Sequence, residues 1–593
     1  MNLGILAHVD AGKTTLTERL LFTAGAIDAV GSVDDGNTTT DSLALERQRG
    51  ITIKSAVASF MAGDVPVNLI DTPGHPDFIA EVERVLGVLD GAVLVVSAVE
   101  GVQAQTRVLM RALKRLRLPT LIFVNKVDRA GADVPRVLDE IRAKLTPSIV
   151  PMGADPTEVL AEHDETLLAA YVGNRKPGEA ELAAALASQS RRGLVHPVFS
   201  GSAMKGRGIE ELIDGIAALL PGAGGDPDGP LQGTVFKVER SPAGEKIAYV
   251  RLFNGTLNVR DRVGDAKVTA IEGGSVRAGE IGKVWGLAGV RIGDHLGEVH
   301  ERNAVRFAPP TLETVVDADD RGRLHAALAE LAEQDPLINL RQGGERQEIS
   351  LSLYGEVQKE VIQATLADEY GVEVTFSETT TICAERPTGP GAAVRVIGED
   401  GNPYLATVGL RVDPGAGVVF RLEVELGSLP PAFMKAIEET VRATLLRGPQ
   451  GWEVGDVTVT LTHSGYWARQ SHAHGSFDKS MSSTAGDFRS VTRLVLMEAL
   501  RRAGTRVLEP MHRFHLEIPP DALGPILPVL SRLRAVPETT TPGWTLEGVI
   551  PAAQVHELRQ LLPTLTHGEG VLESAFDHYR PVARNPVSMM PRL

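Results

Sequence analysis

Residues 7–14 read AHVDAGKT and directly follow the short apolar run LGIL at residues 3–6. The stretch matches the phosphate-binding pattern GxxxxGKT, with alanine in the position of the first glycine. In such a loop the backbone N–H groups and the N-terminus of the next helix point at a phosphate, and Gly12 allows the close approach. Lys13 would reach the β- and γ-phosphates, and the Thr14 hydroxyl would bind Mg²⁺. Taken alone, the motif also fits a glycine-containing turn with a surface lysine.

Short apolar runs and helical patterns alternate through the first third of the chain. A strand buried on both faces is continuously apolar, so these runs are predicted to be parallel strands. The strands are expected at residues 3–6, 67–70, 91–97 and 120–125, with helices at residues 14–21 and 102–116. The alternation predicts a doubly wound α/β sheet, which binds its ligand at the carboxyl ends of the strands.

Three further motifs close apolar runs in the expected order. They are DTPGH at residues 71–75, NKVD at residues 125–128 and GSAMKG at residues 201–206. Asp71 is placed to hold Mg²⁺ through water, and the Gly74 amide is placed to bind the γ-phosphate. Together with the first loop, the motifs predict a nucleotide site, which makes the plain-turn alternative untenable.

The second and third of these motifs select the base. Asp128 would accept hydrogen bonds from the N1–H and exocyclic amine of guanine, a pattern that adenine does not present. Asn125 would read the same ring, and the backbone of Ser202 and Ala203 would touch guanine O6. The predicted ligand is therefore GTP. The predicted nucleotide-binding residues are Ala7, His8, Val9, Asp10, Ala11, Gly12, Lys13, Thr14, Thr15, Asp71, Thr72, Pro73, Gly74, Asn125, Lys126, Val127, Asp128, Ser202 and Ala203.

A switch and a catalytic residue are predicted around the γ-phosphate. Thr52, in RGITI at residues 49–53, would bind Mg²⁺ with Thr14 and Asp71 only while the γ-phosphate is present. His75 takes the place at which many GTPases carry a glutamine that orients the attacking water. Val9 and Ile51 could form an apolar gate that keeps His75 away from the water. A capping or surface histidine is the alternative interpretation of His75.

Bulk properties restrict the class of protein. The chain has 593 residues, a formal net charge of −16 and a single cysteine, Cys383. Length predicts three to five domains, and the acidic balance argues against a general nucleic-acid coat. One cysteine excludes an internal disulfide and fits a cytoplasmic setting, with Cys383 expected to be a buried apolar residue. We found no apolar run long enough to cross a membrane and no signal peptide.

The motifs HVDAGKTT, RGITI, DTPGH and NKVD together resemble those of translational GTPases. Residues 233–263 resemble their β-barrel domain, residues 327–336 and 347–374 the third domain of elongation factor G, and residues 507–519 the start of its fifth domain. From residue 513 onward, the pattern of strand, helix, two strands, helix and strand is that of a ferredoxin-like split βαβ.

The resemblance implies five domains. They are a GTP-binding domain at 1–228, β-barrel domain II at 229–310, α+β domain III at 311–384, domain IV with a decoding-site loop at 385–508, and ferredoxin-like domain V at 509–593. Little room remains after Asp128 for the large inserted subdomain of elongation factor G. Residues 17–53 and 89–113 most closely resemble tetracycline-resistance ribosomal protection proteins of the oxytetracycline type. A terminal helix of many relatives is expected to be missing here.

Residues 464–488 read SGYWARQSHAHGSFDKSMSSTAGDF, at the place where the resemblance implies a ribosome-contacting tip. Aromatic rings can stack on unstacked bases, while cations and hydroxyls suit phosphates and 2′-hydroxyls. The predicted contact residues are Tyr466, Trp467, Arg469, Lys479, Ser480, Met481, Ser482, Ser483 and Thr484. A plain polar hairpin, aromatics packed under the loop, and a metal site at His463, His472 and His474 are the alternatives.

The resemblance implies a ribosome-dependent GTPase that binds the 70S ribosome, needs GTP and Mg²⁺, acts as a monomer and releases tetracycline from the decoding site. Two alternatives remain: a translocation factor like elongation factor G, or a GTP-switched ribosome-binding module that modulates translation under stress. The tip departs from the family pattern by an insertion at residues 468–480 and by the absence of prolines. These departures bear on drug displacement and leave the GTPase motifs intact.

Overall fold

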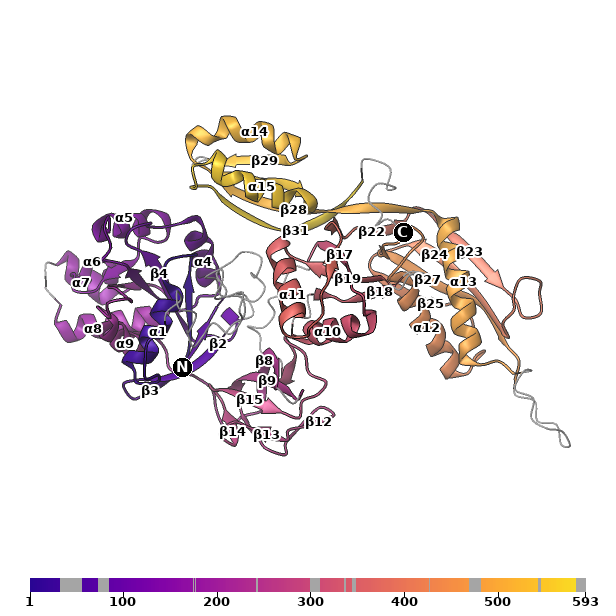
Figure 1. The fold of residues 1–593 in the computed structure, drawn as a ribbon, viewed down its shortest axis with the longest axis horizontal. Coiled ribbons are helices and arrows are strands. Elements are labelled where there is room, and N and C mark those ends of the chain that lie inside the picture. Colours follow the sequence, from indigo (N-terminus) through magenta and orange to yellow (C-terminus); the bar gives the residue numbers. More distant parts are fainter. Residues whose placement is uncertain are drawn as a thin grey trace.

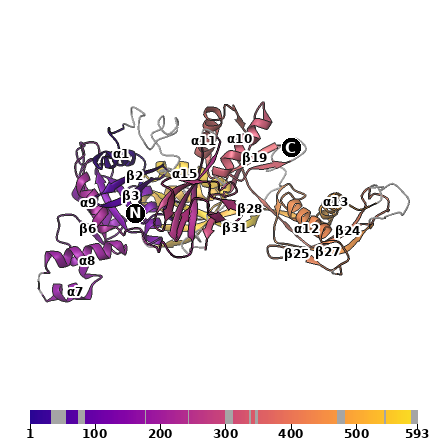
Figure 2. The same cartoon turned by 90° about the horizontal axis from the view of Figure 1, so that it is seen from below.

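The computed structural model describes residues 1–31, 56–72, 85–173, 175, 177–241, 244–298, 310–334, 338–343, 348–425, 427–468, 482–541 and 545–582. The first domain lies at one end of an elongated molecule and the fourth domain at the other (Figure 1). The third and last domains lie between them, and the same order holds in the perpendicular view (Figure 2). We found no helix, within the described ranges, that is long and apolar enough to cross a membrane.

The first domain is built on a seven-stranded sheet in the order β2-β3-β1-β4-β5-β7-β6. Its strands are β1 (Asn2–Ala7), β2 (Ala56–Ala62), β3 (Val65–Asp71), β4 (Gly91–Ser97), β5 (Thr120–Asn125), β6 (Ile149–Pro151) and β7 (His196–Ser200). All neighbours run parallel except β2, which pairs antiparallel with β3. The doubly wound sheet is therefore confirmed, and the four predicted parallel strands are β1, β3, β4 and β5.

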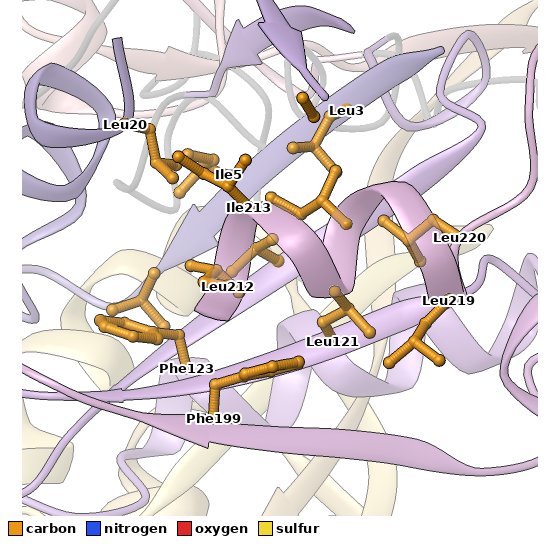
Figure 3. Packing of buried hydrophobic residues seen from close by; sticks show 14 of the residues in the cluster. Leu3, Ile5, Leu20, Leu121, Phe123, Phe199, Leu212, Ile213, Leu219 and Leu220 are labelled. Atoms are coloured by element: carbon orange, nitrogen blue, oxygen red, sulfur yellow. The ribbon is translucent and has the colours of Figure 1, made fainter. Parts of the chain in front are cut away.

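Helices cover both faces of this sheet, including α1 (Lys13–Thr23), α4 (Ala104–Arg115), α5 (Val134–Lys144) and α9 (Ile209–Leu219). Leu212 and Ile213 of α9 pack among buried residues of the strands, including Ile5 and Phe123 (Figure 3). The strands are nearly continuous in apolar residues because both faces are covered. A small helical insert, α6 (Thr157–Ala161), α7 (Glu165–Val172) and α8 (Glu179–Arg191), fills the short segment between β6 and β7.

The strand β2 was not predicted from the sequence. It forms a hairpin with β3 through a tight turn in which Gly63 has φ 59°. A glycine with positive φ suits a two-residue hairpin turn. The segment 56–62 lies on the edge of the sheet and mixes exposed with buried residues, so it lacks the continuous apolar run of the central strands.

The second domain is a small β-barrel docked on the first. Its main sheet runs β13-β15-β9-β8-β16, with two short pairs, β10–β14 and β11–β12. The bounds are β8 (Gln232–Arg240), β9 (Lys246–Asn254), β10 (Thr256–Asn258), β11 (Arg262–Val263), β12 (Ala266–Lys267), β13 (Ala270–Ile271), β14 (Ser275–Arg277), β15 (Ile281–Trp285) and β16 (His295–Gly297). Arg251 of β9 pairs with Asp90 of the first domain at 2.7 Å, and Phe236 and Tyr249 of the barrel are buried against apolar residues of the first domain.

The third domain is an α+β unit with two helices on one antiparallel sheet, ordered β18-β19-β17-β20 with β21 also on β17. Its elements are β17 (Leu312–Asp317), α10 (Arg321–Gln334), β18 (Arg341–Gly343), β19 (Glu348–Leu353), α11 (Glu356–Asp368), β20 (Thr375–Phe376) and β21 (Thr380–Thr381). Its core includes Leu324 and Leu328 of α10, Leu351 of β19 and Leu366 of α11.

The fourth domain packs α12 (Pro431–Leu445) and α13 (Ala485–Ala503) on a sheet ordered β23-β24-β27-β25. The strands are β23 (Gly391–Arg395), β24 (Ala406–Pro414), β25 (Val418–Leu422) and β27 (Val457–Tyr466). The parallel pairing of β25 with β27 mixes with antiparallel neighbours.

The last domain shows the predicted split βαβ order. Its elements are β28 (Thr505–Glu517), the short helix η5 (Pro520–Ala522), α14 (Leu523–Arg532), β29 (Val536–Thr541), β30 (Thr545–Pro551), α15 (Ala552–Leu565) and β31 (Val571–Pro581). The strand β28 starts well before residue 513 and pairs at its first half with β22 (Ala384–Pro387), beside β26 (Glu453–Val454). This sheet thus includes β22, which precedes the fourth domain's sheet, and β26, which lies between α12 and β27. Cys383, just before β22, is buried as expected.

Candidate nucleotide site

The phosphate-binding loop joins β1 to α1, as the motif predicts. Gly12 caps α1 with φ 89°, a conformation that side chains rarely adopt. A Cβ added at Gly12 would lie 2.5 Å from the side-chain nitrogen of Asn125 and would have to displace it, so the position strongly favours glycine. The first turn of α1 has no side-chain cap and no acidic residue. Uncapped N–H groups at a helix N-terminus suit a phosphate, so the loop fits the predicted ligand.

The predicted phosphate and Mg²⁺ ligands lie together beneath this loop. Lys13 Nζ and Asp71 Oδ1 form a buried ion pair. Thr72, the next residue, donates its hydroxyl to the carbonyl of Ile5 at 3.0 Å, which ties the end of β3 to β1. The cation expected on the phosphates and the carboxylate expected near Mg²⁺ thus meet at one point. A Mg²⁺–nucleotide would offer each of them a partner of opposite charge.

Asn125 connects three loops of the site. Its amide nitrogen donates to the carbonyl of Ala11 at 2.9 Å, and its oxygen accepts from the amide of Ala203 at 2.9 Å. The side chain predicted to read guanine therefore links the phosphate loop to the third motif. The Ala203 amide, expected to reach guanine O6, donates to Asn125 in this structure.

Asp128 lies exposed at the rim of the site, where a base could reach it. A hydrogen bond from the Ser202 hydroxyl lowers the pKa of Asp128, and the nearby cations Arg129 and Lys205 act in the same direction. The carboxyl group therefore stays ionised at neutral pH and can act as a double acceptor. This is the state that the predicted contact with guanine requires.

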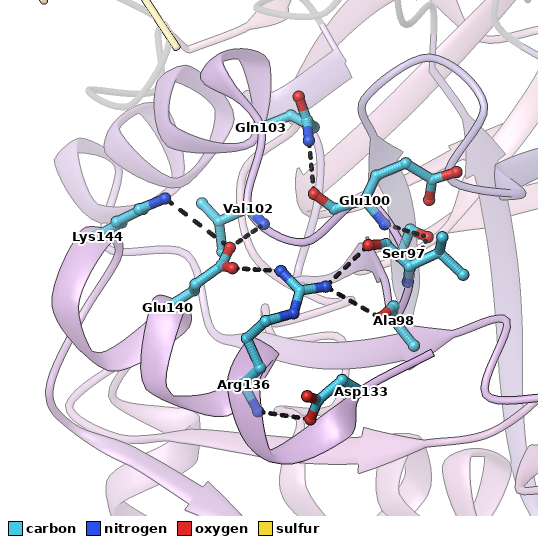
Figure 4. Close-up of polar contacts among 10 residues, drawn as sticks. Ser97, Ala98, Glu100, Val102, Gln103, Asp133, Arg136, Glu140 and Lys144 are labelled. Carbon is cyan, nitrogen blue, oxygen red and sulfur yellow. Dashed lines mark hydrogen bonds and ion pairs between the residues drawn. The ribbon is translucent and has the colours of Figure 1, made fainter. Parts of the chain in front are cut away.

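Figure 4 shows how the neighbouring loop, residues 98–103, is fixed on α5. Arg136 donates to Glu140 at 2.5 Å and to two loop carbonyls at 2.8 and 3.4 Å. Glu140 also accepts from a loop amide at 2.9 Å. The loop in turn carries Glu100, which pairs with Lys126 at 3.2 Å. This ion pair holds the side chain of Lys126 beside the loop. The backbone of Lys126 has a φ of 65°.

His8 is in the predicted loop but its ring faces α4. The ring nitrogen Nδ1 lies 3.0 Å from the Thr106 hydroxyl, and the side chain is buried. Burial lowers the pKa of His8 to about 4, so the ring is neutral at physiological pH. Val9, next to it, is 41% exposed, and its role as a gate stays a prediction. Its proposed partner Ile51 lies outside the described residues, as do Thr52, Pro73, Gly74 and His75.

Arg19 is a site residue that the sequence did not reveal. Its guanidinium donates to the carbonyls of Ala203 and Met204 at 2.8 and 2.7 Å. It therefore supports the third motif from α1. No motif includes this arginine, and a charged residue on a helix face has no distinct sequence signal.

At the tip of the fourth domain, Tyr466 and Trp467 are 39% and 46% exposed. Tyr466 also packs edge-on against Phe433, with ring centroids 5.9 Å apart, so the alternative of packed aromatics holds in part. The Ser483 hydroxyl accepts a hydrogen bond from the backbone amide of Trp467 at 2.8 Å and donates one to the backbone carbonyl just before β24. The Thr484 hydroxyl caps the N-terminus of α13. Contact of these two hydroxyls with RNA stays a prediction.

Among the other predicted tip residues, Ser482 is half-buried. Arg469, Lys479, Ser480 and Met481 lie outside the described residues, as do His472 and His474. Within the described part of the chain, no group of three His, Cys, Asp or Glu side chains could hold a metal ion.

Family models match the first domain and the third, fourth and last domains of the chain. The elongation factor Tu GTP binding domain matches residues 1–222. Elongation factor G domain III matches residues 307–378, its domain IV residues 383–504, and its C-terminus residues 506–590.

Curated relatives match from end to end. An oxytetracycline resistance protein of Streptomyces rimosus is 49% identical, covering 99% of this chain and 96% of the relative. The tetracycline resistance protein TetM of Streptomyces lividans is 46% identical, covering 98% and 97%. TetP of Clostridium perfringens is 42% identical, covering 98% and 94%. A crystal structure of a Thermus thermophilus protein aligns with TM-score 0.64 at 26% identity, covering 99% of this chain and 98% of that chain.

Proposed function

This chain belongs to the tetracycline-resistance ribosomal protection proteins, GTPases related to elongation factor G, and on this premise we propose that it binds the 70S ribosome and releases tetracycline from the decoding site. The identity of 49% over 99% of the chain to an oxytetracycline resistance protein carries the proposal. In support, the elongation factor Tu GTP binding domain and three domain models of elongation factor G match the chain in the expected order. We further propose that the protein acts as a monomer in the cytoplasm.

GTP is the nucleotide, and Mg²⁺ is proposed as its companion ion. Thr14 and Asp71 lie on the two elements that face the phosphate loop and would hold the ion, with Thr52 joining them in the GTP state. Mg²⁺ would neutralise charge on the β- and γ-phosphates. Lys13 would then leave Asp71 and pair with the phosphates.

His75 is proposed to orient the attacking water, with Val9 and Ile51 as a gate that the ribosome opens. A partner that completes the catalytic site raises GTP hydrolysis by about 10³–10⁵-fold in other GTPases. A His75→Ala variant should therefore lose ribosome-stimulated hydrolysis and keep its affinity for GTP, measured as phosphate release and fluorescent-nucleotide binding. Full stimulated turnover in this variant would refute the assignment.

The exposed rings of Tyr466 and Trp467 are proposed to stack on unstacked bases of ribosomal RNA. Replacing both with alanine should leave ribosome-stimulated GTP hydrolysis intact and abolish tetracycline release. Leu446, exposed on the same domain away from the tip strand, provides the control position for a Leu446→Ala variant. Equal drug release by the aromatic double variant and the control would contradict the role of the tip.

The decisive experiment measures labelled tetracycline on purified 70S ribosomes. We expect bound drug to fall when the protein is added with GTP, and recovery of free protein to require hydrolysis. A non-hydrolysable analogue should therefore release at most about one drug per protein. If hydrolysis is strongly stimulated while bound tetracycline stays constant, the drug-release proposal is wrong and the chain is a translation factor of this family.

A further inference from the structure

The first turn of α4 touches two distant parts of the molecule. Thr106 is fully buried and its hydroxyl lies 3.0 Å from Nδ1 of His8, in the phosphate loop. The next residue, Arg107, faces the last domain. Successive residues on a helix point about 100° apart, so adjacent side chains reach different neighbours. One rigid turn therefore touches both the nucleotide site and the last domain.

The contact with the last domain is a cluster of four charged side chains. Arg107 pairs with Glu517 at 2.6 Å and donates to the carbonyl of Glu569 at 2.7 Å. Arg111, one turn later, pairs with Glu517 at 2.9 Å and Glu573 at 3.2 Å. Two arginines share one carboxylate, and the side chains of Arg107 and Glu517 are only 19% and 25% exposed. A partly buried network of this kind contributes more than an isolated surface pair.

The acidic partners sit on the longest strands of the last domain. Glu517 ends β28 and Glu573 lies near the start of β31, and these two strands pair along their length. Figure 1 shows both strands running from this contact toward the fourth domain. A displacement of the last domain therefore acts directly on α4.

The helix α4 also contacts the phosphate-binding loop, through His8. His8 directly follows β1, and its buried ring contacts Thr106 of α4. The helix α4 itself contacts β1 as well as β31. A shift of α4 must therefore either break the contact between Thr106 and His8 or move the loop that binds the phosphates. Packed elements transmit shifts as units because their interiors do not deform continuously.

We propose that Thr106, Arg107 and Arg111 are positioning residues through which the placement of the last domain sets the geometry of the phosphate-binding loop. Thr106 holds the loop through His8, while the two arginines hold the last domain. The coupling works in both directions, because a change in nucleotide affinity caused by domain placement implies the reverse effect. The inference needs only nucleotide binding at the phosphate loop and is independent of drug release.

The test is a double-mutant cycle across the helix. Thr106→Val keeps the shape of the side chain and removes its hydroxyl, and Glu517→Gln removes the shared charge. Stopped-flow release of fluorescent GDP from the full-length protein gives the dissociation rate constant. We expect each variant to change this rate about two- to tenfold, and the double variant to change it no more than the larger single effect. The melting temperature is recorded for every variant.

Arg532→Gln is the matched control. It breaks a pair of 3.0 Å between Arg532 and Glu557 that lies wholly within the last domain. This variant should leave the GDP dissociation rate unchanged. The kcat of ribosome-stimulated GTP hydrolysis should change in Glu517→Gln and should keep its wild-type value in Arg532→Gln.

Two results would overturn the proposal. The first is an unchanged GDP rate in Glu517→Gln, which would make the charge cluster a purely structural contact. The second is a GDP dissociation rate in the double variant that equals the product of the two single fold-changes. The two positions would then act independently. If Thr106→Val fails to fold, Arg111→Gln replaces it in the cycle with Glu573→Gln, and lack of any effect on GDP release there refutes the coupling equally.

Discussion

Single residues in this protein serve several loops at once. Asn125 was predicted to read guanine, and the structure shows it joining the phosphate loop to the third motif by two hydrogen bonds of 2.9 Å. Asp128, three residues later, is exposed and lies outside this pair of bonds. The base-reading role is therefore best tested at Asp128, where substitution leaves these links between the loops intact.

An Asp128→Asn variant should exchange guanine for xanthine specificity. The amide would donate where the carboxylate accepts, and xanthine carries a carbonyl where guanine carries its exocyclic amine. Loss of one charged contact costs about 1.5–3 kcal/mol, so affinity for GTP should fall at least about tenfold. Competition between GTP and XTP for the purified protein measures the exchange. An Asp139→Asn variant, changed on the exposed face of α5, should bind GTP normally.

His512 should make the last domain sensitive to acid. Both ring nitrogens are buried without a hydrogen-bond partner in the described part of the chain, and burial lowers its pKa to about 4. The folded state then binds this proton less readily than the unfolded chain, whose histidine has a pKa of about 6.5. The contribution of neutral His512 to stability is therefore complete above about pH 6.5 and is lost as the pH falls toward about 4.

A His512→Leu variant should show a flatter dependence on pH. Its melting temperature should fall less than that of the parent between pH 7 and pH 5, since the variant has no proton to bind at this position. His8 and His196, also buried and with their pKa values lowered to about 4, remain in both proteins and contribute to the residual slope. Identical slopes in the two proteins would show that His512 does not titrate in this range.

At the scale of elements, helix ends and edge strands were the hardest features to predict. The strand β2 has no continuous apolar run because its outer side faces solvent. The helix α13 was not delimited from its sequence, although Thr484 and Asp487 form a reciprocal capping box at its start. The same threonine was predicted to contact RNA, so its structural and its proposed functional roles need to be separated.

Thr484→Ala should destabilise the fourth domain by about 1 kcal/mol, because a capping hydroxyl satisfies an otherwise unpaired helix amide. Thr484→Ser keeps the cap and should restore most of the stability. Chemical denaturation, monitored by tryptophan fluorescence, measures the stability of both variants. If Ser and Ala variants unfold alike, the capping box does not stabilise α13.

At the scale of the whole molecule, charged pairs join the domains beside apolar contacts such as those of Phe236 and Tyr249 of the barrel with the first domain. Asp90 accepts from the backbone and side chain of Asn2 at 2.8 Å each and pairs with Arg251 of the barrel. Arg251 is only 3% exposed, so water cannot solvate its charge and the carboxylate of Asp90 offsets it. The charged cluster between α4 and the last domain likewise links the first domain to the last domain.

Asp90→Asn should weaken the contact between the first domain and the barrel by about 3 kcal/mol, because it removes a carboxylate from beside a buried arginine. Limited proteolysis between the two domains and differential scanning calorimetry measure the loss. The exposed pair of Arg142 and Asp139 is the control, since breaking it should cost under about 1 kcal/mol. Equal losses for the two variants would contradict the role of the buried pair.

The sequence by itself determined the motifs of the nucleotide site, and its resemblance to translational GTPases implied the order of the domains. Motifs such as AHVDAGKT and NKVD place functional groups within a few residues of a strand end, where backbone geometry alone decides their position. The periodic apolar patterns likewise predicted β1, β3, β4 and β5 and the split βαβ of the last domain. The motifs and the apolar patterns could be predicted because they depend on residues that lie close together in the sequence.

Only the tertiary structure decided which side chains link these parts. Arg107 and Glu517 are 410 positions apart, and neither has a motif or a periodic pattern that points to the other. His8 could equally have faced the nucleotide, and its burial against Thr106 follows from how α4 packs on β1. Such contacts arise when several domains fold together, because only the packed chain brings distant charges within reach and excludes water from them.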